Sequence, residues 1–535
     1  MNLAAIITFF ICAILVAIIS WYKTRREKHD TASGFLFANR KLGFIAVGGA
    51  LYFTNVNAAE FIGENESVYL NNMTVMAWGI SSVFAMLVVS EFIMPIYMRG
   101  AMSTTPDFLE SRYDAGTKKL VSILFLISYL VNMLPIVLYS GAVAINGLFH
   151  FSDFLGIGYA TSIWILILVI GVAGCTYSVL GGLKAISVSD VALGAGMVAG
   201  GLLLLYFGFD YLGKGNAADG IRTVLSSNTN RFNAVGNAKD AVPFSTIFTG
   251  MLIINLFYWG TEQVIVQQAL SAKNLAESQK GIALACVGKL IGPLLFNIPG
   301  IIAVHLYSHM QNTAEVFPRL VSDVTPPVLS GFIASVIFGA AITSFAPGLN
   351  SAGTLFILNL YKPYKAKKKE PVTERQLVKR TKQFELFACL LAVCIAPLIL
   401  LSKGGFYTYM QKVNGVFNVP IFTIMFVGFI TRKVPPVAAK TGLIFCIAAY
   451  LLTQLVFDTG LHFLHVLAIL FLLTVLLMLV IGKCYPLKTP YVPVDKGVID
   501  LKPWKGRYWA AAVLLLIMMA IFIVFSPVGI AAGNP

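Results

Sequence analysis

The chain has 535 residues, of which 58% are hydrophobic and 12% are charged, and its mean hydropathy is +0.81. Soluble globular proteins carry about 25% charged residues, so this composition excludes a soluble multidomain enzyme and a disordered scaffold. The formal net charge of +15 suggests nucleic-acid binding at first sight, but the apolar composition indicates an integral membrane protein and excludes a nucleic-acid binder.

Apolar runs long enough to cross a bilayer follow one another along the chain, separated by polar or Pro/Gly-rich breaks. A helix needs about 20 apolar residues to cross a hydrocarbon core of roughly 30 Å. By this measure the sequence predicts an all-α membrane protein, one transmembrane domain over residues 1–535 with about fourteen helices. The predicted spans are 3–21, 44–67, 73–97, 119–148, 160–181, 185–212, 246–269, 280–306, 328–360, 381–402, 409–431, 439–457, 461–482 and 508–526.

The first span lacks a preceding basic region and an evident cleavage site, so we expect a retained anchor and not a secretory signal. The loops that would be cytoplasmic if the N-terminus is outside hold most of the basic residues, chiefly in 23–28, 362–382 and 483–507. Because positive residues favour the cytoplasmic side, both termini are predicted to lie outside. The lysines within 365–369 can alternatively bind anionic lipid.

Several classes of function are excluded by what the loops and spans contain. The sequence shows no phosphate loop, zinc-protease signature or kinase motif, so an ATP-driven pump is not expected. The cysteines have no metal-ligand spacing, and neither a disulfide nor a metal cluster is predicted. These cysteines are Cys12, Cys175, Cys286, Cys389, Cys394, Cys446 and Cys484.

Polar residues interrupt the second and seventh spans. Asn55, Asn57 and Glu60 stand at mid-depth of the second, and the segment 255–263 gathers polar and aromatic groups beside Gly260 in the seventh. The asparagines can serve interhelical hydrogen bonds, but a carboxylate also needs a partner. Broken helices at corresponding positions of two repeats are typical of a transporter site.

The eighth and ninth spans add further polar groups. Thr343 and Ser344 can bond back to their own helix, or can offer oxygen ligands to a small cation together with carbonyls freed where the second span unwinds. Lys289 lies away from the basic loops. Its ammonium group can bind substrate hydroxyls, snorkel or pair with a carboxylate.

Five short motifs occur in an order and spacing that together resemble the sodium:solute symporter family, nearest to the sodium/glucose cotransporters and their bacterial sodium/galactose members. The similarity runs from the first span to at least the eleventh. The motifs are FLFANR at 35–40, TPDFLESRY at 105–113, YSVLGGLKA at 177–185 followed by Asp190, Asn-x-x-Tyr-Trp-Gly at 255–260 and LNS at 349–351.

The resemblance implies a LeuT-like fold with two inverted five-helix repeats, over 44–212 and 246–431. Extra helices would precede them at 3–21 and follow them at 439–526. It also implies alternating access around a central site, with Na+ and a small solute, most simply a sugar, as the transported partners in the cell membrane. The residues define no oligomeric state.

The resemblance assigns site residues position by position. Sodium would be held by backbone oxygens of Phe53, Val56 and Ala340 and by the hydroxyls of Thr343 and Ser344, with Asp190 on the cytoplasmic route. Tyr258 would stack on the sugar ring as an inner gate, although it and Trp259 can also serve ordinary packing. The matching sugar positions are Ser82, Asn255, Trp259, Lys289 and Gln411.

The pocket departs from the family pattern at several positions. Glu60 replaces a glutamine and Gly79 replaces a sugar-binding glutamate, so one carboxylate has changed position. We expect Glu60 to accept substrate hydroxyls or to pair with Lys289. Glu262 and Gln268 also replace an asparagine and an arginine of the predicted inner region.

Three functions therefore remain, and no catalytic constellation suggests an enzyme. A sodium-coupled sugar symporter is favoured. A symporter of the same family for inositol, an amino sugar, sialic acid or a proline-like solute is the alternative. A channel or sensor would lack sodium-dependent accumulation.

Overall fold

A computed structural model describes residues 2–24, 31–37, 40–56, 58–310, 312–401, 406–456 and 459–532. Asn57 and the basic residues Arg25, Arg26 and Lys28 lie outside these described residues. Throughout the described ranges the regular structure is helical, apart from a parallel bridge between Leu42 and Ala272.

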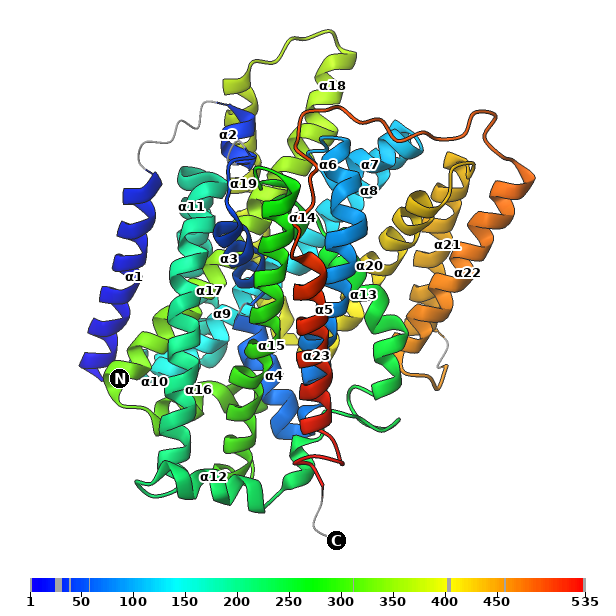
Figure 1. The fold of residues 1–535 in the computed structure, drawn as a ribbon. Coiled ribbons are helices and arrows are strands. Elements are labelled where there is room, and N and C mark those ends of the chain that lie inside the picture. Colours follow the sequence, from blue (N-terminus) through cyan, green and yellow to red (C-terminus); the bar gives the residue numbers. More distant parts are fainter. Residues whose placement is uncertain are drawn as a thin grey trace.

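The helices lie side by side in one bundle (Figure 1). In the first half they are α1 (Leu3–Thr24), α2 (Ala32–Phe37), α3 (Phe44–Asn55), α4 (Ala58–Leu70), α5 (Ala77–Val88), α6 (Met94–Arg99), α7 (Thr105–Arg112), α8 (Ala115–Ser128), α9 (Leu134–Phe149), α10 (Phe151–Leu155), α11 (Tyr159–Leu212) and α12 (Ala217–Ser226). In the second half they are α13 (Gly250–Gly260), α14 (Gln263–Leu270), α15 (Leu275–Leu306), α16 (Val316–Val324), α17 (Pro327–Thr354), α18 (Lys362–Lys367), α19 (Glu374–Ile395), α20 (Phe406–Ile430), α21 (Pro436–Leu455), α22 (Phe463–Cys484) and α23 (Arg507–Val524).

Twelve helical segments of the described chain are long and apolar enough to cross a bilayer. The two remaining predicted spans, 44–67 and 246–269, are each split into a pair of shorter helices, α3 with α4 and α13 with α14. Large apolar side chains are exposed on the outer helices, for example Phe10 on α1 and Leu472 on α22. A continuous apolar exterior of this kind fits lipid as solvent.

The helix α11 corresponds to two predicted spans, 160–181 and 185–212. Its apolar limbs are Tyr159–Gly181 and Ala185–Leu212. The Tyr177 hydroxyl donates to the Ala185 carbonyl at 2.9 Å, whereas eight residues of straight helix would separate these positions by about 12 Å. The chain therefore doubles back between the limbs, as expected for two successive spans.

The ends of the bundle differ in what they carry. In Figure 1, α1 begins and α23 ends in the lower half of the view, the half that holds α12, whereas α18 and the start of α19 lie at the upper end. The lysine-rich loop is thus at the end opposite to both terminal positions. The basic residues predict that this loop and the two termini lie on opposite sides of the membrane, and the arrangement agrees with that. Which end faces the cytoplasm stays a prediction.

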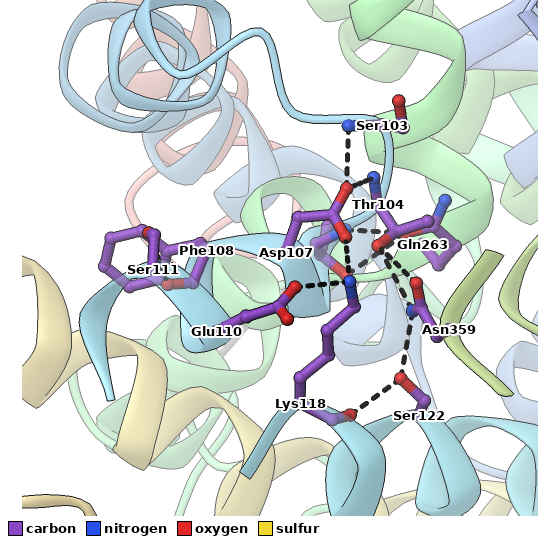
Figure 2. A network of polar contacts seen from close by, with 11 residues as sticks. Ser103, Thr104, Asp107, Phe108, Glu110, Ser111, Lys118, Ser122, Gln263 and Asn359 are labelled. Carbon is purple, nitrogen blue, oxygen red and sulfur yellow. Dashed lines mark hydrogen bonds and ion pairs between the residues drawn. The ribbon is translucent and has the colours of Figure 1, made fainter. Parts of the chain in front are cut away.

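Figure 2 shows a polar network near the α18 end that joins α7 to α8, α14 and the helical turn after α17. Lys118 of α8 lies 2.9 Å from Asp107 and 2.6 Å from Glu110. Gln263, the first residue of α14, accepts a hydrogen bond from the Thr105 amide at 2.8 Å. Segments from both halves of the chain are therefore tied together at this end of the bundle.

The breaks in the two split spans leave backbone groups without helical partners. Val56 has extended dihedrals, φ −80° and ψ 102°, directly after α3. Between α13 and α14, Thr261 and Glu262 are also non-helical. Because the last four carbonyls of a helix have no intrahelical partner, the end of α3 presents oxygens at the centre of the bundle.

Candidate functional site

A cavity of about 170 Å³ lies beside the breaks and is bounded by α3–α5, α8–α9, α13–α15 and α20. This volume is below the range of about 300–1,000 Å³ for open ligand pockets, so the cavity is compact in this conformation. It is lined by all the residues predicted to bind the solute, namely Glu60, Ser82, Asn255, Tyr258, Trp259, Lys289 and Gln411. Their role in binding stays a prediction.

An ion pair crosses the cavity from α4 to α15. The Lys289 ammonium nitrogen lies 3.6 Å from a carboxylate oxygen of Glu60, and both side chains are largely buried. Of the two roles expected for Glu60, pairing with Lys289 is thus observed. A Cβ atom on Gly79 would come within 2.6 Å of the Pro293 ring, so α15 occupies the space that a longer side chain at 79 needs.

The hydroxyls and amides of the cavity are only partly satisfied by one another. The Asn255 amide donates to the Ser81 hydroxyl at 3.1 Å, and the hydroxyl of Ser82 donates to the Gly79 carbonyl of its own helix at 2.6 Å. The Oδ1 atom of Asn55 is buried without a hydrogen-bond partner in the described part of the chain. An acceptor therefore remains available to a hydroxylated molecule.

Aromatic side chains form part of the wall. The rings of Tyr258 and Trp259 meet edge to face, with centroids 5.4 Å apart. Trp259 is buried, whereas Tyr258 is half-buried in the cavity. This geometry leaves the Tyr258 ring able to contact a solute while Trp259 packs, so the packing alternative applies most directly to Trp259.

Some lining residues were missed by the sequence reasoning. Glu64, Trp78, Tyr129, Asn414 and Asn418 also face the cavity. A signal existed for Glu64, because residues four apart share one helix face and Glu64 follows Glu60 by four. The others come from elements whose facing sides depend on tertiary packing.

Glu262 and Gln268 are buried and bonded within the bundle. Glu262 lines the cavity just before α14 and accepts a hydrogen bond from the Tyr129 hydroxyl. The side-chain amide of Gln268 donates to the Thr54 hydroxyl at 2.8 Å. Both replacements therefore contact the central region, and Gln268 contacts the end of α3.

The residues predicted to bind sodium meet where α3 ends against α17. The Ser344 hydroxyl donates to the Thr54 carbonyl at 3.1 Å. Thr54 lies in the same short segment as Phe53 and Val56, whose backbone oxygens are predicted to bind sodium. The Thr343 hydroxyl bonds back to the Ala340 carbonyl at 3.4 Å, which is the alternative interpretation given above for this residue. These oxygens are hard ligands of the kind that a small cation prefers.

Asp190 adds a carboxylate to this cluster of oxygens. It is fully buried, and the hydroxyls of Thr54 and Thr343 face it, with Thr54 Oγ1 at 3.4 Å from Asp190 Oδ2. Its other oxygen, Oδ1, is buried without a hydrogen-bond partner among the described residues. A buried carboxylate oxygen without a donor fits a cation route.

A second, larger cavity adjoins the first toward the end opposite α18. Its volume is about 680 Å³, and Trp78 and Gln411 line both cavities. Its further lining includes Asp240, Lys412 and His462. The two cavities therefore share part of their walls.

Comparison with known proteins identifies the kind of molecule. The model of the sodium:solute symporter family matches residues 35–446. The chain is 37% identical to the uncharacterized symporter YidK of Escherichia coli strain K12 over 98% of its own length and 91% of that protein. It is 26% identical to a sodium/glucose cotransporter of Vibrio parahaemolyticus, over 81% of each chain.

The fold is also similar to that of a solved structure. The structure of a Na+-coupled sialic acid symporter, in a substrate-bound outward-open state, superposes with a TM-score of 0.78 over 92% of this chain and 99% of that one. The sequence identity of that pair is 19%, so the match concerns the fold. Relatives and neighbour alike are membrane transporters and not enzymes.

Proposed function

The chain belongs to the sodium:solute symporter family, and we propose on that premise that it couples Na+ influx to uptake of a hexose-sized sugar or a similar hydroxylated ring. Transport proceeds by alternating access in the cell membrane. Glu60, Lys289 and Asn255 bind solute hydroxyls, Ser82 and Gln411 supply further polar contacts, and Tyr258 covers the ring beside Trp259.

One observation carries the coupling between ion and solute. Thr54 lines the solute cavity, and its carbonyl accepts the hydrogen bond from Ser344 at the proposed sodium site. A sodium ion bound there by Thr343, Ser344 and the end of α3 would hold the segment between α3 and α4 in one conformation. Glu60 lies in the first turn of α4, directly after this segment. Sodium thus favours the conformation that binds solute, which is the differential affinity that coupling requires.

The driving force suffices for accumulation of a neutral solute. One Na+ moving down 100 mV supplies about 2.3 kcal/mol, and a tenfold sodium gradient adds about 1.4 kcal/mol. The sum of about 3.7 kcal/mol corresponds to roughly 500-fold accumulation. A single sodium site of the kind proposed here is therefore adequate for uptake.

The acidic lining bears on the alternative solutes. Three carboxylates and one ammonium group line the cavity, so a solute that carries a carboxylate would meet like charge. Sialic acid is therefore disfavoured relative to inositol, an amino sugar or another polyol, and a proline-like solute would also place a carboxylate there. A hexose or cyclic polyol scaffold, with or without an amino group, is therefore the proposal that the lining supports best.

Variants of α17 test the sodium site. In proteoliposomes, Thr343→Ala and Ser344→Ala should raise the half-saturating Na+ concentration by about 10- to 100-fold, since each removes a polar partner worth about 1.5–3 kcal/mol to a cation. Ser335→Ala is the matched control, because this hydroxyl bonds only to the Phe332 carbonyl among the described contacts. Unchanged sodium dependence in both site variants would contradict the proposed site.

A further inference from the structure

The solute cavity carries more acidic than basic side chains. Its ionisable lining groups are Glu60, Glu64, Glu262 and Lys289, beside the tyrosines. The lysine balances one of the carboxylates. Uncompensated charge inside a membrane protein is costly, so each remaining carboxylate needs its own stabilising partner.

Two of the carboxylates have such a partner in the protein. Glu60 pairs with Lys289 at 3.6 Å. Glu262 accepts a hydrogen bond from the Tyr129 hydroxyl and stands directly before α14, where the helix N-terminus favours negative charge. Neither of these carboxylates requires a ligand for its stabilisation.

Glu64 differs from both. Its side chain is 3% exposed, and its Oε2 atom is buried without a hydrogen-bond partner in the described part of the chain. The charged groups that act on it are Glu60, which repels it, and Lys289, which already pairs with Glu60. Glu64 therefore lines the cavity wall without a hydrogen-bond donor or a cation of its own among the described residues.

We propose that the transported solute carries a primary or secondary ammonium group on its hydroxylated ring, and that this group binds Glu64. The proposal rests on the proposed function, because it concerns the same cavity and names the chemistry of the solute. An amino sugar or an amino-substituted cyclic polyol has this combination of groups.

The neighbouring atoms discriminate between kinds of donor. An ammonium group donates two or three hydrogen bonds and carries a positive charge. Glu64 Oε2 and Asn55 Oδ1 are acceptors unpaired within the described ranges, on residues that line the cavity. A hydroxyl can donate to Glu64 but brings no positive charge to the neighbouring carboxyl groups of Glu60 and Glu64. A quaternary ammonium balances the charge but has no N–H to donate. The aromatic faces of Trp78 and Tyr258 line the same space and attract a cation.

Paired probes test the proposal. Uptake into proteoliposomes under an inward Na+ gradient is measured with glucosamine against glucose, and with galactosamine against galactose, at a pH where the amine is protonated. We expect the wild-type protein to prefer an amine over its parent sugar by about tenfold or more. Glu64→Gln should weaken uptake affinity for the amine by about 10- to 100-fold and for the parent sugar by less than about threefold.

Two further variants guard against a folding defect. Glu64→Asp keeps the charge and should keep the preference for the amine. Glu66→Gln is the matched control on the same helix, because Glu66 accepts a hydrogen bond from Thr313 at 2.5 Å and is not part of the cavity lining. It should leave both probes unchanged. Stabilisation of each purified variant by the amine, measured as a rise in unfolding temperature, checks binding without transport.

The opposing outcomes are distinct. Sodium-dependent uptake of the parent sugars with no preference for amines, or a Glu64→Gln effect that is equal for both probes, overturns the inference while the proposed function stands. Proton uptake accompanying a neutral sugar, lost in Glu64→Gln, also overturns it by assigning a proton to Glu64. If no probe shows sodium-dependent uptake, the sugar assignment and the inference both fail.

Discussion

Removing one partner of the Glu60–Lys289 ion pair is expected to cost more than removing both. The nitrogen and oxygen atoms are 3.6 Å apart, and the Lys289 and Glu60 side chains are 7% and 18% exposed. At an effective dielectric constant of about 20, unit charges at this separation attract by about 4.6 kcal/mol. Desolvation offsets much of that attraction, so we expect a coupling free energy of about 1.5–3 kcal/mol, or about 10- to 150-fold in affinity.

A double-mutant cycle measures this coupling. It compares Glu60→Gln, Lys289→Met and the double variant by the half-saturating solute concentration of sodium-dependent uptake and by the unfolding temperature in detergent. Lys289→Met leaves Glu60 and Glu64 without a cation and should be the most impaired, with partial recovery in the double variant. If the single effects add within about 0.5 kcal/mol, the two charges do not interact and the reasoning is refuted.

Variants at three further positions give separate readouts. Tyr258→Ala should raise the half-saturating solute concentration by about tenfold, and Tyr258→Phe by much less, because ring contacts are worth about 0.5–1.5 kcal/mol; equal effects of the two variants would refute ring stacking. Burial would raise the pKa of the Asp114 carboxyl, but hydrogen bonds, the largest from Lys440, hold this pKa below its ordinary value. The pair therefore stabilises the protein at neutral pH, and this stability is lost as the pH falls below about 4. Accordingly, Asp114→Asn should lower the unfolding temperature at neutral pH and match wild type in acid, and a difference that persists in acid would contradict this. Lys118→Met should lower the unfolding temperature through loss of its bonds to Asp107, with the half-saturating Na+ concentration unchanged; a shift in sodium dependence would instead connect the network of Figure 2 to the ion site.

The breaks in the spans were predictable from the sequence. A carboxylate and two amides at mid-depth of an apolar run conflict with a continuous lipid-facing helix, and the structure ends α3 at Asn55 and begins α4 at Ala58. The same logic located Lys289, because a lone lysine in an apolar run needs a partner. Glu60 was expected either to accept substrate hydroxyls or to pair with Lys289, and the structure shows the pair.

Other features depended on packing between distant segments. The adjacent hydroxyls of Thr343 and Ser344 could not show whether Thr343 bonds to its own helix or offers its oxygen to a cation. In the structure its hydroxyl bonds to the Ala340 carbonyl and also faces Asp190. Helix periodicity places Glu64 on the same face as Glu60, but only the facing helices determine that Lys289 pairs with Glu60. Only the structure could show that Glu64 lacks a hydrogen-bond partner among the described residues.

The moved carboxylate has a comparable explanation. Sequence alone showed glycine at 79 and glutamate at 60, without a reason for the exchange. In the structure the Pro293 ring closes on Gly79, whereas Glu60 extends from the break toward Lys289. Close approach of α15 thus favours glycine at one position and leaves space for a carboxylate at the other.

The coupling of ion to solute is tested most directly with purified wild-type protein in liposomes. Uptake of radiolabelled hexoses, their amine derivatives and inositol is compared under an inward NaCl gradient and an equal choline chloride gradient. We expect accumulation of at least one of these solutes above equilibrium with sodium and equilibration or less with choline. Equal transport of that solute in both salts would contradict sodium-coupled symport.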